Sequence, residues 1–103
     1  MTSFEQRESA LEAQFAHQQE LGFRARERAV GALAKWAAQR LGKTPQAVES
    51  YAAEMVAADV ANPSIEATLE RISGDLSAAS VRKEDVNRMM DLLLTDSRNS
   101  VRA

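Results

Sequence analysis

The sequence predicts an all-α protein: a four-helix bundle with a long first helix and a partly disordered N-terminal arm. The chain has 103 residues, of which 45% are hydrophobic but only 5% aromatic. Ala is its main apolar residue, so the composition suits close helix packing better than a sheet. Only four Gly and two Pro interrupt it, and apolar residues recur at helical spacings of three and four. A chain of this length builds one modest core.

The longest predicted helix comes first. Ser3 and Gln6 have the spacing of a capping box, and the helix can continue to Leu41, where Gly42 would end it. Its apolar residues form two stripes. Phe4, Leu11 and Phe15 lie within about 40° of each other, while a second set is centred roughly 60° further round.

Three shorter helices should follow. Thr44-Pro45 and Asn62-Pro63 each read as an N-cap followed by Pro at the first helical position, and a last helix begins near Ser80 and frays into a polar tail. The expected core residues of the four helices are, in order, Phe23, Val30, Leu33, Ala37 and Leu41; Val48, Tyr51, Ala52, Met55 and Val56; Ile65, Leu69, Ile72 and Leu76; and Val86, Met89, Met90, Leu93 and Leu94.

The break between the two stripes suggests a division of labour. Gly22 stands at the junction and costs up to about 1 kcal/mol relative to Ala. We therefore expect an N-terminal arm of residues 1–22 and a helical bundle domain of residues 23–103. A segment of this length is marginal as an isolated helix, so the arm should be partly ordered until it meets a partner. The alternative is that its stripe packs on the protein's own bundle.

The charge balance argues against several classes of partner. The chain has thirteen basic and fifteen acidic side chains and a pI of about 5.4. It therefore lacks the excess of positive charge that binding to nucleic acid requires. The chain has no Cys for a disulfide or thiolate site. The charged start lacks the apolar core of a secretion signal, and no window is apolar enough to insert in a membrane, so we expect a cytoplasmic protein.

No motif indicates catalysis, and the sequence predicts neither an enzyme nor a bound cofactor. His17 is the only histidine, and with Glu12 and Glu20 alone it reads as a solvated face, so no metal site is expected. Gly74-Asp75 has no glycine-rich loop around it, and any nucleotide binding would be weak and superficial.

A basic cluster, Arg24, Arg26 and Arg28, surrounds Glu27. One interpretation is a set of salt links along the helix surface, each contributing a few tenths of a kcal/mol. The other is contact with an acidic patch on a partner or with a nucleotide phosphate.

The chain resembles a known family over nearly its whole length. The matching residues are Phe4, Arg7-Glu8, Ala10, Glu12-Ala13, Phe15-Ala16, Phe23, Ala25, Leu33, the run from Trp36 to Gly42, Tyr51, Ala52, Glu54, Val56, Ala58, Asp59 and the Gly-Asp-Leu-Ser of residues 74–77. In this pattern the chain is similar to the zeta subunits that inhibit the F-type ATP synthase of alphaproteobacteria. It departs from them at Ala29 and Val30, where the family has a basic residue and an Asn, and its fourth helix is similar only in pattern.

The resemblance implies a function as well as a fold. It implies that the arm enters the catalytic interface between the alpha and beta subunits of the synthase, close to gamma, and blocks ATP hydrolysis. The partner-binding residues would be Phe4, Arg7, Glu8, Leu11, Glu12 and Phe15, and the protein would be peripheral to the inner membrane through the synthase. The competing hypothesis is a small helical adaptor that binds another protein through the bundle surface.

Overall fold

The computed structural model describes the backbone of residues 2–102 and the side chains of residues 6–100. Four α-helices follow one another: α1 (Thr2–Arg40), α2 (Pro45–Ala61), α3 (Ile65–Leu76) and α4 (Lys83–Arg102), with a short 3₁₀ helix η1 (Ser77–Ala79) after α3. The described residues contain no strand. The all-α, four-helix prediction with a long first helix is confirmed.

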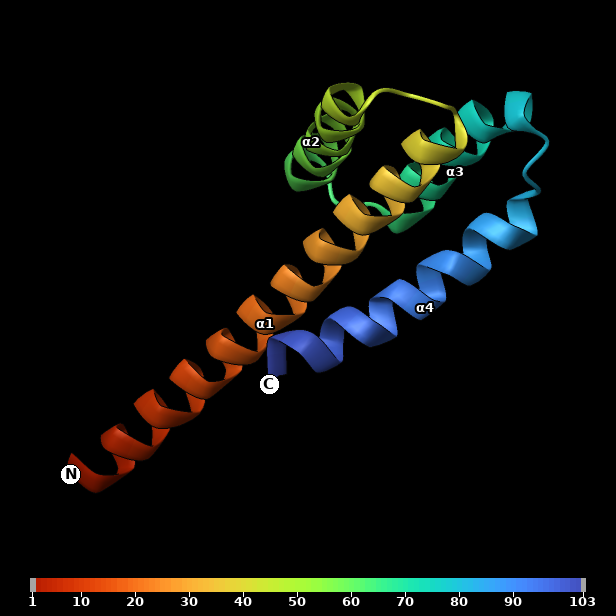
Figure 1. Ribbon diagram of the computed structural model, residues 1–103. Helices are drawn as coiled ribbons and strands as arrows, with labels where there is room; N and C mark the ends of the chain where they lie inside the picture. Colours follow the sequence, from red (N-terminus) through yellow and green to blue (C-terminus); the bar gives the residue numbers. More distant parts are fainter. Residues whose placement is uncertain (1, 103) are drawn as a thin grey trace.

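The long helix α1 is the axis of the molecule (Figure 1). Helix α4 runs antiparallel beside its middle, and α2 and α3 lie near its C-terminal end. The N-terminal part of α1 projects beyond the end of α4, which gives the molecule extents of 63 × 26 × 25 Å. Helix α1 has no break at Gly22. Partial disorder of the arm in solution stays a prediction.

Helix α1 ends as its sequence predicts. Gly42 adopts a left-handed conformation, with φ of 75°, which a residue without a Cβ adopts at little cost. The amide of Gly42 donates to the carbonyl of Gln39, and the amide of Lys43 donates to that of Ala38. These two bonds satisfy carbonyls that the helix end leaves free. Thr44 then caps α2 by accepting a hydrogen bond from the amide of Ala47 at 3.2 Å.

The predicted start of the third helix is wrong by two residues. Asn62 ends α2, and its amide donates to the carbonyl of Ala58. The N-cap of α3 is Ser64, whose hydroxyl accepts from the amide of Ala67 at 3.1 Å. Pro63 thus precedes the cap and belongs to the short connection between the two helices.

The fourth helix also differs from its prediction at both ends. Ser80 does not cap it, but ends η1 in a left-handed conformation with φ of 60°. Helix α4 begins at Lys83, with Glu84 and Asp85 in its first turn, where acidic side chains complement the helix dipole. The polar tail that should fray is helical to Arg102 and buries Ser97 to 2% exposure.

The core lies between the second half of α1 and the other three helices. On α1 it is built mainly from Ala, which lets neighbouring helices approach closely. Its buried members are Ala29, Val30, Leu33, Ala34, Ala37, Ala38, Val48, Tyr51, Ala52, Met55, Ile72, Leu76, Val86 and Met90. Most of the predicted core residues are among them, and Leu41, Val56, Ile65, Leu69, Met89, Leu93 and Leu94 pack against this cluster while partly buried. Each fully buried large side chain contributes about 1.5 to 3 kcal/mol.

Candidate partner-binding site

The apolar stripe of the arm faces solvent. Every side chain from Gln6 to Glu20 is exposed. Leu11 is 66% exposed and Phe15 is 61% exposed, and their spacing of four places them on one face of α1. The side chain of Phe4, the third predicted member, lies outside the described residues. Leu11 and Phe15 therefore do not pack on the bundle in this structure.

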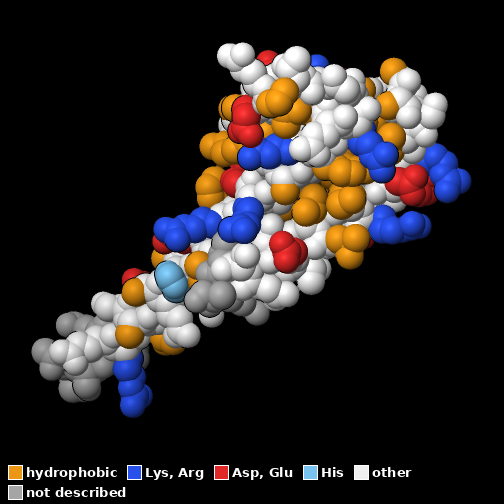
Figure 2. All heavy atoms as spheres, in the orientation of Figure 1, with side chains coloured by type: hydrophobic (Ala, Val, Ile, Leu, Met, Phe, Trp, Pro, Cys, Tyr) orange, Lys and Arg blue, Asp and Glu red, His pale blue; other side chains and the backbone are white. Residues whose placement is uncertain are grey.

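Charged residues border this stripe on both sides. At 100° per residue around the helix axis, Arg7 lies on one side of Leu11, and Glu8 and Glu12 lie on the other. All three are exposed. The space-filling view shows the arm as a narrow rod with apolar side chains set among polar ones (Figure 2). An apolar strip with charged edges is the form of a helix that fits a partner's groove.

Phe23 was expected in the core, and that prediction is wrong. Its side chain is 47% exposed. Ala25, two residues later and so about 200° further round the helix, is 2% exposed. The bundle thus covers the side of α1 that carries Ala25 and leaves the side of Phe23 open. Three of the five large apolar side chains that are clearly exposed in the described residues, Leu11, Phe15 and Phe23, belong to the first part of α1.

The end of α4 meets the base of the arm. A groove of about 590 Å³ is formed there by one side of α1 and by Arg98 of α4. Its other lining residues are Gln14, His17, Gln18, Leu21, Gly22 and Ala25. His17 thus lies among amides and an arginine. No group of three metal-ligating side chains occurs in the described part of the chain.

The basic cluster does not behave as one unit. Arg24 pairs with Glu20 at 2.6 Å along the helix, as the surface interpretation predicts. Arg26 instead reaches across to α2, where its Nε and one terminal nitrogen donate to the two carboxylate oxygens of Asp59, each at 2.9 Å. This two-pronged geometry is the strongest form of a charge-assisted pair. Arg28 lines a groove between α1 and α2.

Asp59 connects three helices. Its carboxylate is fully buried, receives Arg26 of α1, and also accepts from the amide of Ser64 at 3.1 Å and from the hydroxyl of Thr68 at 3.5 Å. Burial alone would raise the pKa of Asp59, but the hydrogen bonds from Arg26 and from the amide of Ser64 outweigh it and lower this pKa to about 2. The hydrogen bonds that Arg26 donates to Asp59 also raise the pKa of Arg26.

Glu27 lies beside this pair without a hydrogen-bond partner. Its Oε1 is 4.0 Å from Nε of Arg26, both of its carboxyl oxygens are buried, and neither is hydrogen-bonded. Burial raises the pKa of Glu27 to about 7, and Asp59 acts in the same direction, because its negative charge disfavours a second one and its carboxylate can accept a hydrogen bond once Glu27 is protonated. Sequence reasoning missed both acids. The available signal was Asp59 itself, which follows Met55 by four residues and so continues the apolar stripe of α2, where an acid requires a partner.

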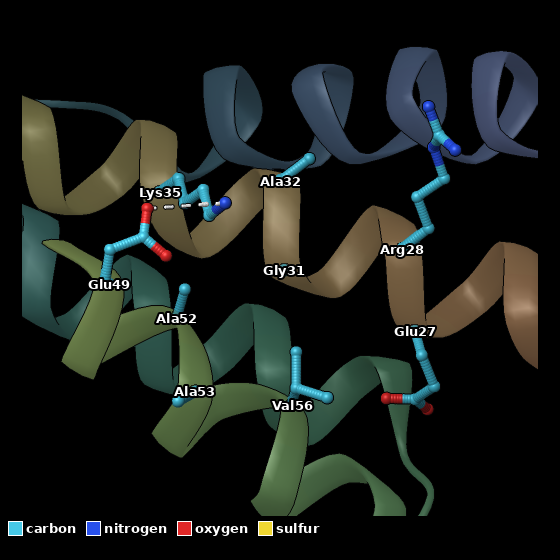
Figure 3. Close-up of a pocket in the computed structure, with 9 residues that line it drawn as sticks. All are labelled: Glu27, Arg28, Gly31, Ala32, Lys35, Glu49, Ala52, Ala53 and Val56. Carbon is cyan, nitrogen blue, oxygen red and sulfur yellow. Dashed lines mark ion pairs between the residues drawn. The ribbon is translucent and has the colours of Figure 1, made fainter.

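The groove between α1 and α2 opens next to Glu27 (Figure 3). It has a volume of about 510 Å³ and a floor of small or apolar residues, including Gly31, Ala52 and Val56. Lys35 and Glu49 form an ion pair of 3.5 Å across its far end. The two helices pack closely at Gly31, where a Cβ would stand 3.4 Å from Cγ2 of Val56.

The comparisons with known proteins decide the family. The chain matches the family described as ATPase inhibitor subunit zeta over residues 1–100. The chain belongs to the ATPase inhibitor subunit zeta family. Neither a curated protein nor a solved structure is significantly similar to it. The resemblance found in the sequence is confirmed, because the match covers the arm and the bundle together.

Membership in the zeta family gives the exposed arm a context. An inhibitor subunit acts by contact with an ATPase, and this zeta chain carries a strip of exposed apolar residues on a projecting helix. None of the helices in the described residues combines the length and the low polarity that crossing a membrane requires.

Proposed function

We propose that this zeta-family chain inhibits the F-type ATP synthase by inserting its arm, residues 1–22, into the interface between the alpha and beta subunits, near gamma. The bundle, residues 23–103, anchors the arm. The observation that supports this most directly is the exposure of Leu11 and Phe15, at 66% and 61%, on a helix that projects beyond its own bundle. A helix in an interface that must open and close in each catalytic step blocks it sterically, and no catalytic group is required.

The energetics require both parts of the chain. Burying Leu11 and Phe15 in a groove would supply about 1.5 to 3 kcal/mol each. Ordering a flexible segment takes back roughly 2 to 5 kcal/mol. The arm alone therefore binds weakly, and a bundle docked elsewhere on the enzyme raises its effective concentration at the groove.

The charged borders of the strip have a different part. Arg7, Glu8 and Glu12 are exposed, so they would meet the partner at the rim of the groove, where charge pairs determine register and association rate more than affinity. Phe4 precedes Leu11 by seven residues, and this helical spacing predicts that it belongs to the same strip.

The test is inhibition of ATP hydrolysis by the isolated catalytic sector of the organism's own enzyme. The full chain should inhibit, and a chain without residues 2–19 should bind more weakly and fail to inhibit. An adaptor that uses only the bundle surface predicts no inhibition by the full chain and no effect of the deletion on binding to its partner. That result would overturn the proposal.

A matched pair of substitutions sharpens this test. Leu11→Ala removes an apolar side chain from the arm, and Leu92→Ala removes one of nearly equal exposure, 66% against 62%, from α4. Only Leu11→Ala should weaken inhibition. Equal losses in the two variants would show that the exposed strip of the arm has no special role.

A further inference from the structure

The junction between α1 and the corner where α2 meets α3 contains two carboxyl groups and one guanidinium. Nε of Arg26 is 2.9 Å from Oδ2 of Asp59 and 4.0 Å from Oε1 of Glu27. The Asp59 side chain is fully buried, and that of Glu27 is 12% exposed. One positive charge therefore serves two buried acids, and both acids cannot be ionised there without cost.

The hydrogen-bond pattern shows which acid is satisfied. Asp59 accepts from Arg26 twice, from the amide of Ser64 and from Thr68. Both oxygens of Glu27 are buried without a partner. Two carboxylates cannot hydrogen-bond to each other, because both only accept. A proton on Glu27 supplies the missing donor, and its hydroxyl can then donate to Asp59.

A cation larger than a proton has no access to the carboxyl oxygens of Glu27. Both carboxyl oxygens of Glu27 are shielded from solvent, so an ammonium or guanidinium group could reach them only after the side chain moved. The other charged groups around this junction belong to all the neighbouring helices. They are Arg28 and Lys35 of α1 and Glu49 of α2, which line the adjoining groove, Arg71 of α3, which lines the hollow beside Asp59, and Arg98 of α4, which lines a separate groove with Ala25.

We propose that a proton held between Glu27 and Asp59 latches α1 to the corner where α2 meets α3, so that the junction is closed when Glu27 is neutral and loosened when Glu27 is ionised. Asp59 is the fixed half of the latch, since it accepts a hydrogen bond from the amide of Ser64 at the start of α3 and holds Arg26. Glu27 is the movable half. When ionised, it can turn into the groove that opens beside it; Lys35 lies at the far end of this groove, paired with Glu49 (Figure 3).

The direction of the pH effect follows from the raised pKa of Glu27, about 7. A carboxyl group in an unfolded chain titrates near 4.3. The folded state therefore binds the proton more tightly, and the latch is fully closed below pH 4.5 and opens as the pH rises through 7. This device operates in the isolated protein and does not depend on the proposed inhibition of the synthase.

The test is a carboxyl NMR titration of Glu27 in the full chain between pH 3 and 9, with amide exchange measured across the α1–α2 junction. All variants also carry His17→Gln, which removes the only histidine of the chain. We expect a midpoint near 7 for Glu27 and a roughly tenfold rise in junction opening between pH 6 and 8, after correction for intrinsic exchange. A midpoint near 4.3 would overturn the proposal.

Two matched variants separate the latch from general charge effects. Glu27→Gln keeps a donor of similar shape beside Asp59, so junction opening should lose its dependence on pH between 6 and 8. Glu49→Gln removes an exposed acid from the far end of the same groove and should leave that dependence intact. An unchanged pH dependence in Glu27→Gln would overturn the proposal. If Glu27→Gln does not fold, the NMR titration midpoint of Glu27 in the chain that retains this residue decides between the two outcomes.

Discussion

Phe15 and Leu33 point to the same side of α1, about five helical turns apart, yet Phe15 is 61% exposed and Leu33 is completely buried. The face that forms the core in the second half of α1 thus continues along the arm without a covering helix. The difference comes from which side of α1 the other helices cover at each level, since both side chains are large and apolar. Substitutions of these two residues can therefore test the stability of the bundle and binding by the arm separately.

Truncating the two residues should change the free energy of unfolding by very different amounts. Leu33→Ala leaves a cavity in the core and should lower the free energy of unfolding by about 2 to 5 kcal/mol. Phe15→Ala removes an exposed side chain and should change it by less than about 0.5 kcal/mol. Urea denaturation of both variants measures the difference. A large loss in Phe15→Ala would show that the arm packs on the bundle in solution.

The exposed residues of the arm should instead matter for inhibition. Replacing both Phe4 and Phe15 with Ala should weaken inhibition of ATP hydrolysis, because these side chains would fill the partner's groove, and should leave the melting temperature within a few degrees. Leu92→Ala is the control, since it removes an exposed apolar side chain from α4. Full inhibition by the double variant would contradict the proposed binding strip.

The fold was predictable because its signals are local. Gly42 ends α1 and Thr44 caps α2 within a few residues of the positions they control, and helical spacing identified Ile72 and Val86 as core residues. Phe23 was misplaced for a different reason. Its exposure depends on which side of α1 the other helices cover, and spacing within one helix contains no information about where its neighbours pack.

The junction could be predicted only in part. Arg26 and Asp59 are separated by 33 positions, so no local pattern joins them, and the surface salt links expected for the cluster describe Arg24 but not Arg26. The second polar contact of Asp59, with the start of α3 through Ser64, depends on the connection whose N-cap was predicted two residues too early. Chemistry that depends on packing three helices together requires the structure.

The order of the arm should respond to Gly22. This residue is exposed inside α1, and a Cβ there would have no neighbour within 4 Å. Gly22→Ala should therefore stabilise the helix by roughly 0.5 to 1 kcal/mol and slow amide exchange in the arm. It should also strengthen inhibition, because less ordering remains to be done on binding.

Gly22→Pro provides the opposite perturbation. Proline in a helix interior costs about 3 kcal/mol and removes a backbone donor, so arm amides should exchange faster and inhibition should weaken. Circular dichroism checks the helix content of both variants. Equal arm protection in the Ala variant and the original chain would show that the arm is already fully ordered in solution.

Acid should weaken the bundle through Asp59. Its pKa is about 2 in the folded protein and lower than in an unfolded chain, so the unfolded state binds the proton more readily. The stability that this carboxylate contributes, roughly 2 kcal/mol, is present above about pH 4 and is lost as the pH falls toward 2. Urea denaturation between pH 2 and 5 measures the loss.

Asp59→Asn identifies the residue responsible for that loss. The amide keeps the shape of the carboxylate but has no charge for Arg26, so this variant should be less stable at pH 5 by about 3 to 5 kcal/mol. Its stability should then fall less steeply than that of the original chain between pH 4 and 2, because the group that titrates there is gone. The control is Asp75→Asn, which removes an exposed acid that accepts a hydrogen bond from the hydroxyl of Tyr51. If the stability of Asp59→Asn still fell with pH as steeply as that of the original chain, protonation of Asp59 would not be the cause of the loss in acid.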